Sequence, residues 1–229
     1  SRPSLKLTSG GSVLEHHGFV TVIGVDEAPV DVEVRFTANT LASADGAVGA
    51  QAPGGTGTWT LNQGDVLQLL ADVPSDCPGG VSDGMGRTFC NVGDDYDLTG
   101  TEVRASGKVA VISGHECAFV PFDKFACDHL EEQMFPLESW GKDFIVAATE
   151  PLRSEGEPNV VRIVSGKDGN DIAFQPSVSS DVTLGRGEMV EFETTEDFRV
   201  TGFEALMVSQ FLVGQNYFEA SDPEADSHA

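Results

Sequence analysis

Val30-Asp-Val-Glu-Val-Arg-Phe36 is the clearest indication of fold class in this chain of 229 residues. Its apolar and charged residues alternate almost strictly, with valine or phenylalanine at every second position. Successive side chains of a β-strand point to opposite faces of the sheet. The stretch therefore predicts a strand of an antiparallel sheet that has one face on the core and the other in solvent.

Similar short β-branched or aromatic runs recur along the chain between Gly, Pro, Asn and Asp residues, and helical periodicity is nearly absent. Lys167–Asn170 lies between two such runs and predicts a hairpin turn. We therefore expect an all-β chain. The clearest further runs lie at 19–23, 66–70, 109–112, 144–147, 160–164, 172–174, 189–192 and 206–208.

Two stretches of the sequence repeat. Thr60–Leu69 is similar to Thr183–Phe192 at an offset of 123, and Thr101–Val111 is similar to Phe198–Val208 at an offset of 97. The repeat predicts two duplicated antiparallel β-sandwich-like units. A β-propeller-like arrangement is the alternative, although two copies are too few to close a ring.

The change of offset assigns about 26 additional residues to the first copy. We expect a first unit at 1–114 with a stapled insert at 72–97, a connector at 115–143, a second unit at 144–218 and an acidic tail or linker at 219–229. Within the connector, Cys127–Gln133 predicts one or two helical turns, with Asp128 as N-cap and Glu131 at the third helical position.

The formal net charge of −24 limits the possible partners. Binding to nucleic acid requires a cationic surface, and so does attraction to an anionic membrane. Protein, glycan and metal-ion partners are compatible with the charge. No run of 18 apolar residues is present, so we expect no direct membrane insertion.

The four cysteines, Cys77, Cys90, Cys117 and Cys127, form two pairs that are close in sequence. An even number of cysteines at short spacing is typical of an oxidising compartment. There is no Asn-x-Ser/Thr sequon, and the first residues lack an apolar signal region. We expect an extracellular or cell-surface protein, with no signal peptide in this sequence.

The densest cluster of reactive residues lies in the connector, and it has two interpretations. His115, Cys117, Cys127 and His129 offer two imidazoles and two thiolates for tetrahedral zinc, with Glu116 as a general base if the site were hydrolytic. Alternatively, Cys117 and Cys127 form a disulfide. The one-residue gaps are unusual for zinc, and the Cys77 and Cys90 pair has no flanking histidine, so the spacing favours disulfides.

Asp94, Asp95 and Asp97 offer oxygen ligands for calcium, but they lack the register of an EF-hand loop. No other cofactor is expected. The sequence lacks a Gly-x-Ser-x-Gly elbow, a phosphate-binding glycine loop and a His-Glu-x-x-His motif. We therefore expect no catalytic residues and no enzymatic activity.

Lys108–Cys117, Cys127–Gln133 and Trp140-Gly141 stand in an ordered series with Val120-Pro121. This series resembles the N-terminal domain family of the IgG Fc-binding protein, which is secreted and associated with mucin. The resemblance implies a binding or adhesion module of secreted or surface proteins. It also implies structural roles for Cys117 and Cys127 beside His115 and His129, and it carries no catalytic residues. The acidity and the missing sequons favour a bacterial member.

The sequence thus supports a non-enzymatic extracellular recognition or adhesion module that binds a protein or glycan partner through loops. We expect the 72–97 insert to be the contact surface, because a stapled exposed loop can present one. Two alternatives remain open. One is a zinc-dependent hydrolase or structural zinc module, and the other is an architectural spacer without a ligand.

Overall fold

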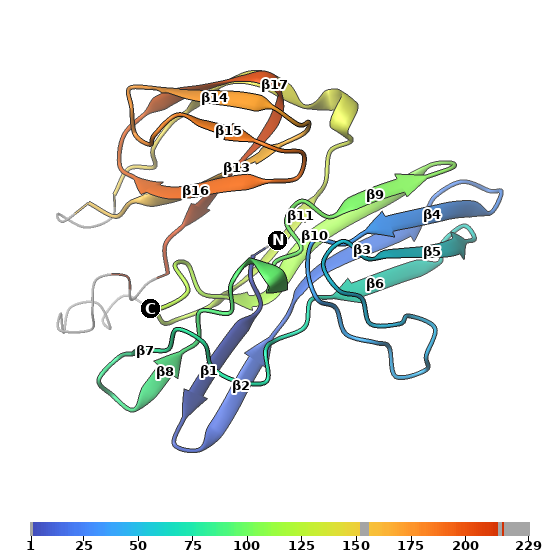
Figure 1. Cartoon of the computed structure of the whole chain (residues 1–229), viewed down its shortest axis with the longest axis horizontal. Helices are drawn as coiled ribbons and strands as arrows, with labels where there is room; N and C mark the ends of the chain where they lie inside the picture. The colour runs from blue at the N-terminus through green and yellow to red at the C-terminus, as the bar shows by residue number, and fades with distance from the viewer. Residues whose placement is uncertain (1, 152–155, 215–216, 218–229) are drawn as a thin grey trace.

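The computed structural model describes residues 2–151, 156–214 and 217, and these residues form an all-β chain (Figure 1). The described part contains 17 strands, all paired antiparallel, and two short 3-10 turns, η1 (Asp94–Tyr96) and η2 (Leu137–Ser139). The prediction of an antiparallel all-β fold is confirmed. The expected tail at 219–229 lies outside the described residues. No helix in the described part is long and apolar enough to cross a membrane.

The first unit consists of two sheets that enclose one core. One sheet has the order β5-β4-β9 and the other the order β11-β10-β3-β6. Val32 and Val34 of β4 lie between the sheets and are almost fully buried against Val22 and Leu69. The strands are β3 (Gly18–Gly24), β4 (Val30–Arg35), β5 (Thr56–Leu61), β6 (Val66–Leu70), β9 (Glu102–Ala105), β10 (Val109–Ala118) and β11 (Asp128–Gln133).

The second unit is built around one long strand, β17 (Phe198–Leu212), which runs through both layers. Its first half pairs with β14 and β12, and its second half pairs with β13. Ile163, Ile172 and Val200 lie in the core between the two halves. The other strands are β12 (Gly141–Val146), β13 (Asn159–Ser165), β14 (Asn170–Gln175), β15 (Val182–Leu184) and β16 (Met189–Thr194).

The two units pair their strands in the same register. Thr21 of β3 lies opposite Gln68 of β6, and the corresponding Arg162 of β13 lies opposite Glu191 of β16. The turns that precede β6 and β16 are also alike. In the first, the Asn62 N–H donates to Asp65 Oδ2 (2.8 Å), and in the second, the Gly185 N–H donates to Glu188 Oε2 (2.7 Å).

These correspondences make the sequence repeat a structural duplication, with β3 to β6 matching β13 to β16 in order. The difference lies in the long strand, because β17 is continuous whereas its counterpart in the first unit is divided into β9 and β10.

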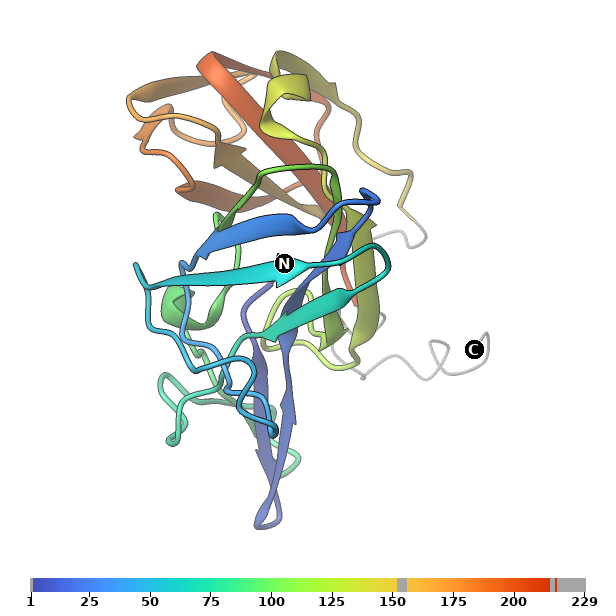
Figure 2. The ribbon, with the colours of Figure 1, turned by 90° about the vertical axis from the view of Figure 1, so that its right-hand side faces the viewer.

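A separate sheet has the order β2-β1-β8-β7, and we call it the distal sheet. It joins an N-terminal hairpin, β1 (Leu5–Ser9) and β2 (Ser12–His16), to the insert strands β7 (Val81–Ser82) and β8 (Arg87–Phe89). The hairpin β1–β2 projects from the body of the molecule (Figure 2). Leu5, Leu7 and Phe89 attach the distal sheet to the connector by packing against Phe119.

The helical turn that the sequence predicts at Cys127–Gln133 is wrong, because Asp128–Gln133 forms strand β11. A helix of one or two turns is marginal without tertiary support. The strand conformation lets this segment continue the β10 ladder, with Leu130 opposite His115 and Gln133 opposite Ile112. The N-cap assigned to Asp128 therefore does not exist.

The turn predicted at Lys167–Asn170 is present, with Gly169 at a φ of 67°, but the two strands it joins are not a hairpin. β13 and β14 do not pair with each other in the described structure, because each pairs with a different half of β17. The turn thus carries the chain from one layer of the second unit to the other.

A buried ionic cluster joins the two units. Arg162 of the second unit contacts Asp97, at the end of the insert, and Glu191 of β16, at 2.7 Å and 2.8 Å. Arg2 also pairs with Glu191 and lies over the ring of Phe211. Three segments far apart in sequence therefore meet at one joint.

Candidate binding surface

The distal sheet is held together by two tight hairpins and a disulfide. Gly10 and Gly11, with φ values of 55° and 84°, form the two-residue turn between β1 and β2. Such positive φ values are accessible to glycine and match the twist of the flanking strands. Cys77 and Cys90 are bonded and close the insert, and the Cys90 N–H donates to the Lys6 carbonyl (2.9 Å).

One apolar row crosses all four strands of the distal sheet. Phe89 pairs with Leu7 on one side and Val81 on the other, and Leu7 also pairs with Leu14. Phe89 and Leu7 are buried, with the Phe89 and Phe119 ring centroids 5.1 Å apart. Val81 and Leu14 flank this buried centre and remain 39% and 42% exposed. The sheet thus carries apolar side chains outward from its own core.

The tip of the distal sheet adds two further exposed apolar side chains. Val13 on the opposite face of β2 is 56% exposed, and Met85 in the β7–β8 turn is 67% exposed. Val13 lies in a row with uncharged residues, because its register partner is Thr8 and Thr8 in turn pairs with Thr88.

Charge is almost absent from this tip. Residues 7–14 carry no charged side chain, and residues 77–86 carry only Asp83. Asp83 forms an ion pair with Arg87, whose guanidinium lies 4.3 Å from the centroid of the Phe125 ring. In a chain with a net charge of −24, this is an uncharged, partly apolar surface on a cross-linked support.

Such a surface suits recognition of another macromolecule. Interface centres are depleted in charged residues and enriched in methionine, and contiguous exposed apolar patches mark interaction sites. Rigid hairpins also lower the entropy lost when the surface binds.

The four residues of the zinc hypothesis do not form a ligand set. Cys117 and Cys127 are joined in a disulfide, so neither offers a thiolate. His115 is fully buried, with Nε2 3.1 Å from the Pro3 carbonyl oxygen and Nδ1 accepting the Cys117 N–H at 3.1 Å. Burial lowers the pKa of His115 to about 4. Its imidazole therefore stays neutral and serves as a hydrogen-bonding link between β10 and the N-terminus.

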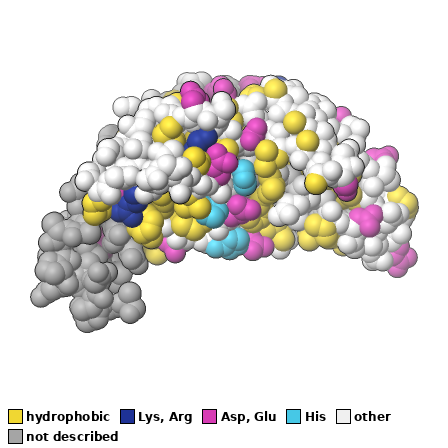
Figure 3. All heavy atoms as spheres, turned by 90° about the horizontal axis from the view of Figure 1, so that it is seen from below, with side chains coloured by type: hydrophobic (Ala, Val, Ile, Leu, Met, Phe, Trp, Pro, Cys, Tyr) yellow, Lys and Arg dark blue, Asp and Glu magenta, His cyan; other side chains and the backbone are white. Residues whose placement is uncertain are grey.

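His129 and Glu116 lie on the exposed side of the same corner. His129 Nε2 is 3.3 Å from Glu131 Oε2, and the Glu116 carboxylate accepts the N–H of His17 at 3.1 Å. Histidine and acidic side chains gather on this face of the molecule (Figure 3). Across the described residues, no three His, Cys, Asp or Glu side chains are placed to hold a metal ion together.

The three aspartates of the calcium hypothesis point to different environments. Asp94 and Asp95 are exposed at η1, whereas Asp97 is buried. Asp97 Oδ2 accepts from Arg162 (2.7 Å), and its Oδ1 accepts from the N–H and hydroxyl of Thr99. Asp97 thus serves the joint between the units.

The N-terminal hairpin, which forms two of the four strands of the distal sheet, is not among the strands predicted from the sequence. A signal was available, because Gly10-Gly11 stands between two stretches that alternate as strands do, with Leu5 and Leu7 before it and Val13 after it. A glycine pair in that position is a hairpin signal. What the sequence could not provide is the pairing of β1 with β8, more than 75 residues away.

Comparison with known proteins identifies a family match over most of the chain. The family model described as IgGFc binding protein matches residues 8–226, which include most of the distal sheet and both units. The human IgGFc-binding protein is 32% identical over 97 residues, which cover 42% of this chain and 2% of the human protein. The chain thus spans a small part of that relative's length. No solved structure matches the chain. Because the family model covers nearly the whole chain, this protein belongs to the IgGFc-binding protein family.

Proposed function

We propose that this chain is a non-enzymatic extracellular recognition module that binds a protein partner through the distal sheet. The observation that carries the proposal is the uncharged apolar tip of that sheet in a strongly acidic protein. Leu14 and Val81 expose aliphatic surface on one face of the sheet, Val13 does so on the other face, and Met85 does so in the β7–β8 turn. Asp83, the only charged residue of 77–86, forms an ion pair with Arg87.

The supporting features concern compartment and rigidity. Two disulfides suit an oxidising environment outside the cell. A protein partner agrees with the side chains available, because removal of aliphatic surface from water is favourable, by about 25 cal/mol per Å² before the costs of association. The insert at 72–97 remains part of the proposed surface, and the β1–β2 hairpin supplies the other part.

The name of the human relative makes the Fc region of IgG the first partner to test. That protein is much longer than this chain, which spans about 2% of it. Secreted glycoproteins and free glycans complete the panel, so that the class of partner is an outcome of the experiment.

The experiment measures binding of the module to this immobilised panel by biolayer interferometry. The test variant is Val13→Asp combined with Met85→Asp, which places two charges at the tip. The matched control is Ile145→Asp combined with Phe203→Asp on the second unit, where both side chains are also strongly exposed. We expect a binding partner of wild type to bind the control equally and the test variant at least tenfold more weakly, with both melting temperatures unchanged.

Equal binding of the test variant and wild type would contradict the distal sheet as the contact surface. Binding of free glycans in preference to proteins would contradict the class of partner. A module that binds no member of a broad extracellular panel would favour the architectural spacer.

A further inference from the structure

The duplication shows a strand position that is filled in one unit and vacant in the other. In the second unit, β12 pairs with the first half of β17, so that Phe144 lies opposite Val200 and Val146 opposite Phe198. The corresponding part of the first unit is β9. Among the described residues, β9 pairs with β4 alone.

The backbone of β9 leaves hydrogen-bonding groups at this vacant edge. The Ser106 N–H donates to the Asp31 carbonyl at 2.9 Å. Because N–H and C=O groups alternate in direction along an antiparallel strand, Glu102 and Arg104 also face β4. The backbone groups of Val103 and Ala105 face the opposite side, where β9 is the outermost strand of its sheet (Figure 1).

The side chains beside this edge are also less covered than their counterparts. Val200 and Leu206 of β17 are completely buried, and each lies opposite a residue of β12. The duplication matches Val103 to Val200 and Val109 to Leu206. Val103 and Val109 pack against the first core but are only partly buried. The first unit therefore lacks the strand that completes burial in the second.

We propose that the outer edge of β9 accepts an extended segment of a partner protein, which pairs antiparallel to it as β12 pairs with β17. This is addition of a strand to a sheet edge, in which main-chain hydrogen bonds provide affinity and alternate side chains provide specificity. The site is distinct from the distal sheet and does not depend on the function proposed for it.

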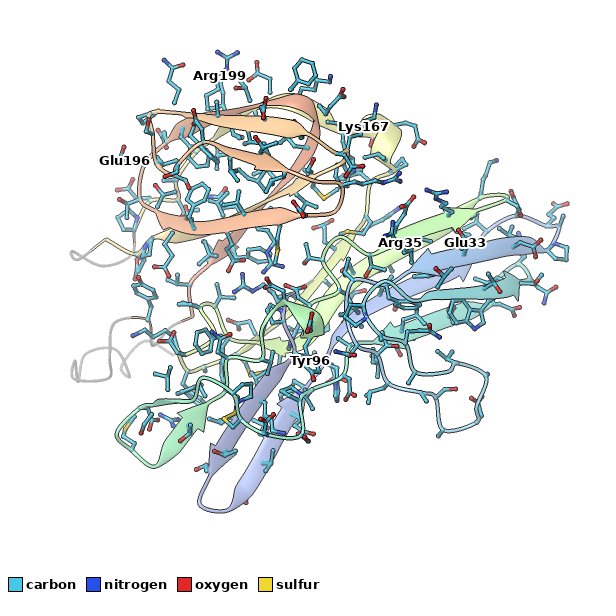
Figure 4. All side chains as sticks on the ribbon, viewed as in Figure 1. Glu33, Arg35, Tyr96, Lys167, Glu196 and Arg199 are labelled. Carbon is cyan, nitrogen blue, oxygen red and sulfur yellow. A yellow bond between two sulfur atoms is a disulfide. The ribbon has the colours of Figure 1, made fainter. Side chains whose placement is uncertain are left out.

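The edge also defines the chemistry of the segment. Two alternate residues should be apolar, as Phe144 and Val146 are, so that they cover Val103 and the neighbouring core. The position equivalent to Asp143 lies opposite Arg104, because Asp143 pairs with Thr201 and Thr201 corresponds to Arg104. An acidic residue there would face the Arg104 guanidinium, whose Nε also donates to Glu102 Oε1 at 2.6 Å. Beyond Arg104, Glu33 and Arg35 of β4 lie on the same outer face and add charge of both signs (Figure 4).

A single segment fits this edge better than a second copy of the chain. The second unit contacts the start of β9, since Arg186 pairs with Glu102 and the backbone of Gly187 lies directly against Gly100. Another complete sheet needs more room beside β9 than one strand does. Two copies would also each bring a net charge of −24.

The probe is a synthetic peptide with the sequence of residues 140–147, the segment that fills this position in the second unit. Its binding to the ¹⁵N-labelled whole chain is followed by NMR. We expect saturable shifts of the Val103 and Ala105 amide signals, and no such shifts with a peptide that carries Phe144→Asp. Shifts that avoid β9, or none at millimolar peptide, would overturn the proposal.

The matched variants are Ala105→Pro and Ala105→Ser. Proline removes the outward N–H of Ala105 without removing a hydrogen bond to β4, and it is tolerated on edge strands, whereas serine keeps that donor. We expect Ala105→Pro to lose peptide binding at an unchanged melting temperature and Ala105→Ser to keep it. Equal binding by both variants would overturn the proposal. A concentration-dependent dimer of wild type that Ala105→Pro abolishes in sedimentation velocity would assign the edge to a second copy and overturn the assignment to a partner.

Discussion

Arg162 and Asp97 form an ion pair whose two side chains are almost completely buried. Burial alone would raise the pKa of Asp97, but the guanidinium of Arg162 and the hydrogen bonds from Thr99 hold the pKa below its ordinary value. Buried pairs of this kind contribute less to net stability than their attraction suggests, because both ions are desolvated. Removal of one partner is strongly destabilising, however, because the remaining charge stays buried without compensation.

We therefore predict that Arg162→Met lowers the free energy of unfolding by about 3–5 kcal/mol. Urea denaturation at pH 7 measures it. The control is Arg199→Met, which removes an exposed pair with Asp143 and should lower the free energy of unfolding far less, because solvent screens that pair. Similar losses of unfolding free energy in both variants would contradict the idea that Asp97 is left buried without compensation in Arg162→Met.

His115 gives the protein a predictable sensitivity to acid. Its pKa is about 4 in the folded protein, against 6.5 for an unperturbed histidine, so the unfolded chain binds more protons between these values. Stability therefore rises with pH across this window. The difference between these two pKa values corresponds to about 3 kcal/mol in the free energy of unfolding. His115→Gln should remove this part of the pH dependence when urea unfolding is compared at pH 4.5 and pH 7.5. An unchanged pH dependence in the variant would contradict the role of His115 in acid sensitivity.

Residue roles were the part of the site least predictable from the sequence. His115 and Asp97 stood out as candidate ligands because of their types and neighbours, yet both are fixed by groups far away in the chain. Pro3 is 112 residues from His115, and Arg162 is 65 residues from Asp97. Local spacing contains no information about such partners, whereas the disulfide between Cys117 and Cys127 joins residues only 10 apart.

At the scale of elements, the strands followed from alternation, but their pairing did not. Val30–Phe36 was expected as a strand with one buried face, and β4 has that pattern of burial. Local capping signals predict one or two helical turns at Cys127–Gln133, but pairing with the edge of β10 makes Asp128–Gln133 a strand. A turn sequence such as Lys167–Asn170 is equally compatible with two strands that pair with each other and with two strands that each pair with a third. The sequence could therefore not distinguish these two arrangements.

A close approach of two turns provides a test at this scale. Gly100 has a φ of 84°, and a Cβ built on it would lie 2.1 Å from the carbonyl oxygen of Gly187 in the second unit. We predict that Gly100→Ala destabilises the protein by more than the roughly 1–2 kcal/mol expected of backbone strain alone. Gly46→Ala is the control, because Gly46 has a similar φ of 75° and open space around it. Equal shifts of the melting temperature would contradict a tight contact between the turns.

At the scale of the whole molecule, the N-terminal segment links parts that otherwise have separate cores. Arg2 pairs with Glu191 of the second unit, the Pro3 carbonyl contacts His115, and the Ser4 N–H donates to Tyr96 of the insert at 3.0 Å. The core around Val32 and the core around Ile163 are distinct clusters. We therefore expect cooperative unfolding of the two units to depend on this joint, since neither of these two cores extends into the other.

This dependence leads to a calorimetric prediction. Wild type should unfold in one transition, with equal van't Hoff and calorimetric enthalpies, because the buried joint couples the units. Deletion of residues 1–4 removes Arg2, Pro3 and Ser4 from the joint and should separate the scan into two transitions. The control is Arg199→Ala, which alters an exposed ion pair within the second unit and should keep the single transition. A single transition after the deletion would mean that the smaller apolar contact of Val120 and Val160 with Phe211 suffices to couple the units. In that case, the ionic cluster orients the units without holding them together.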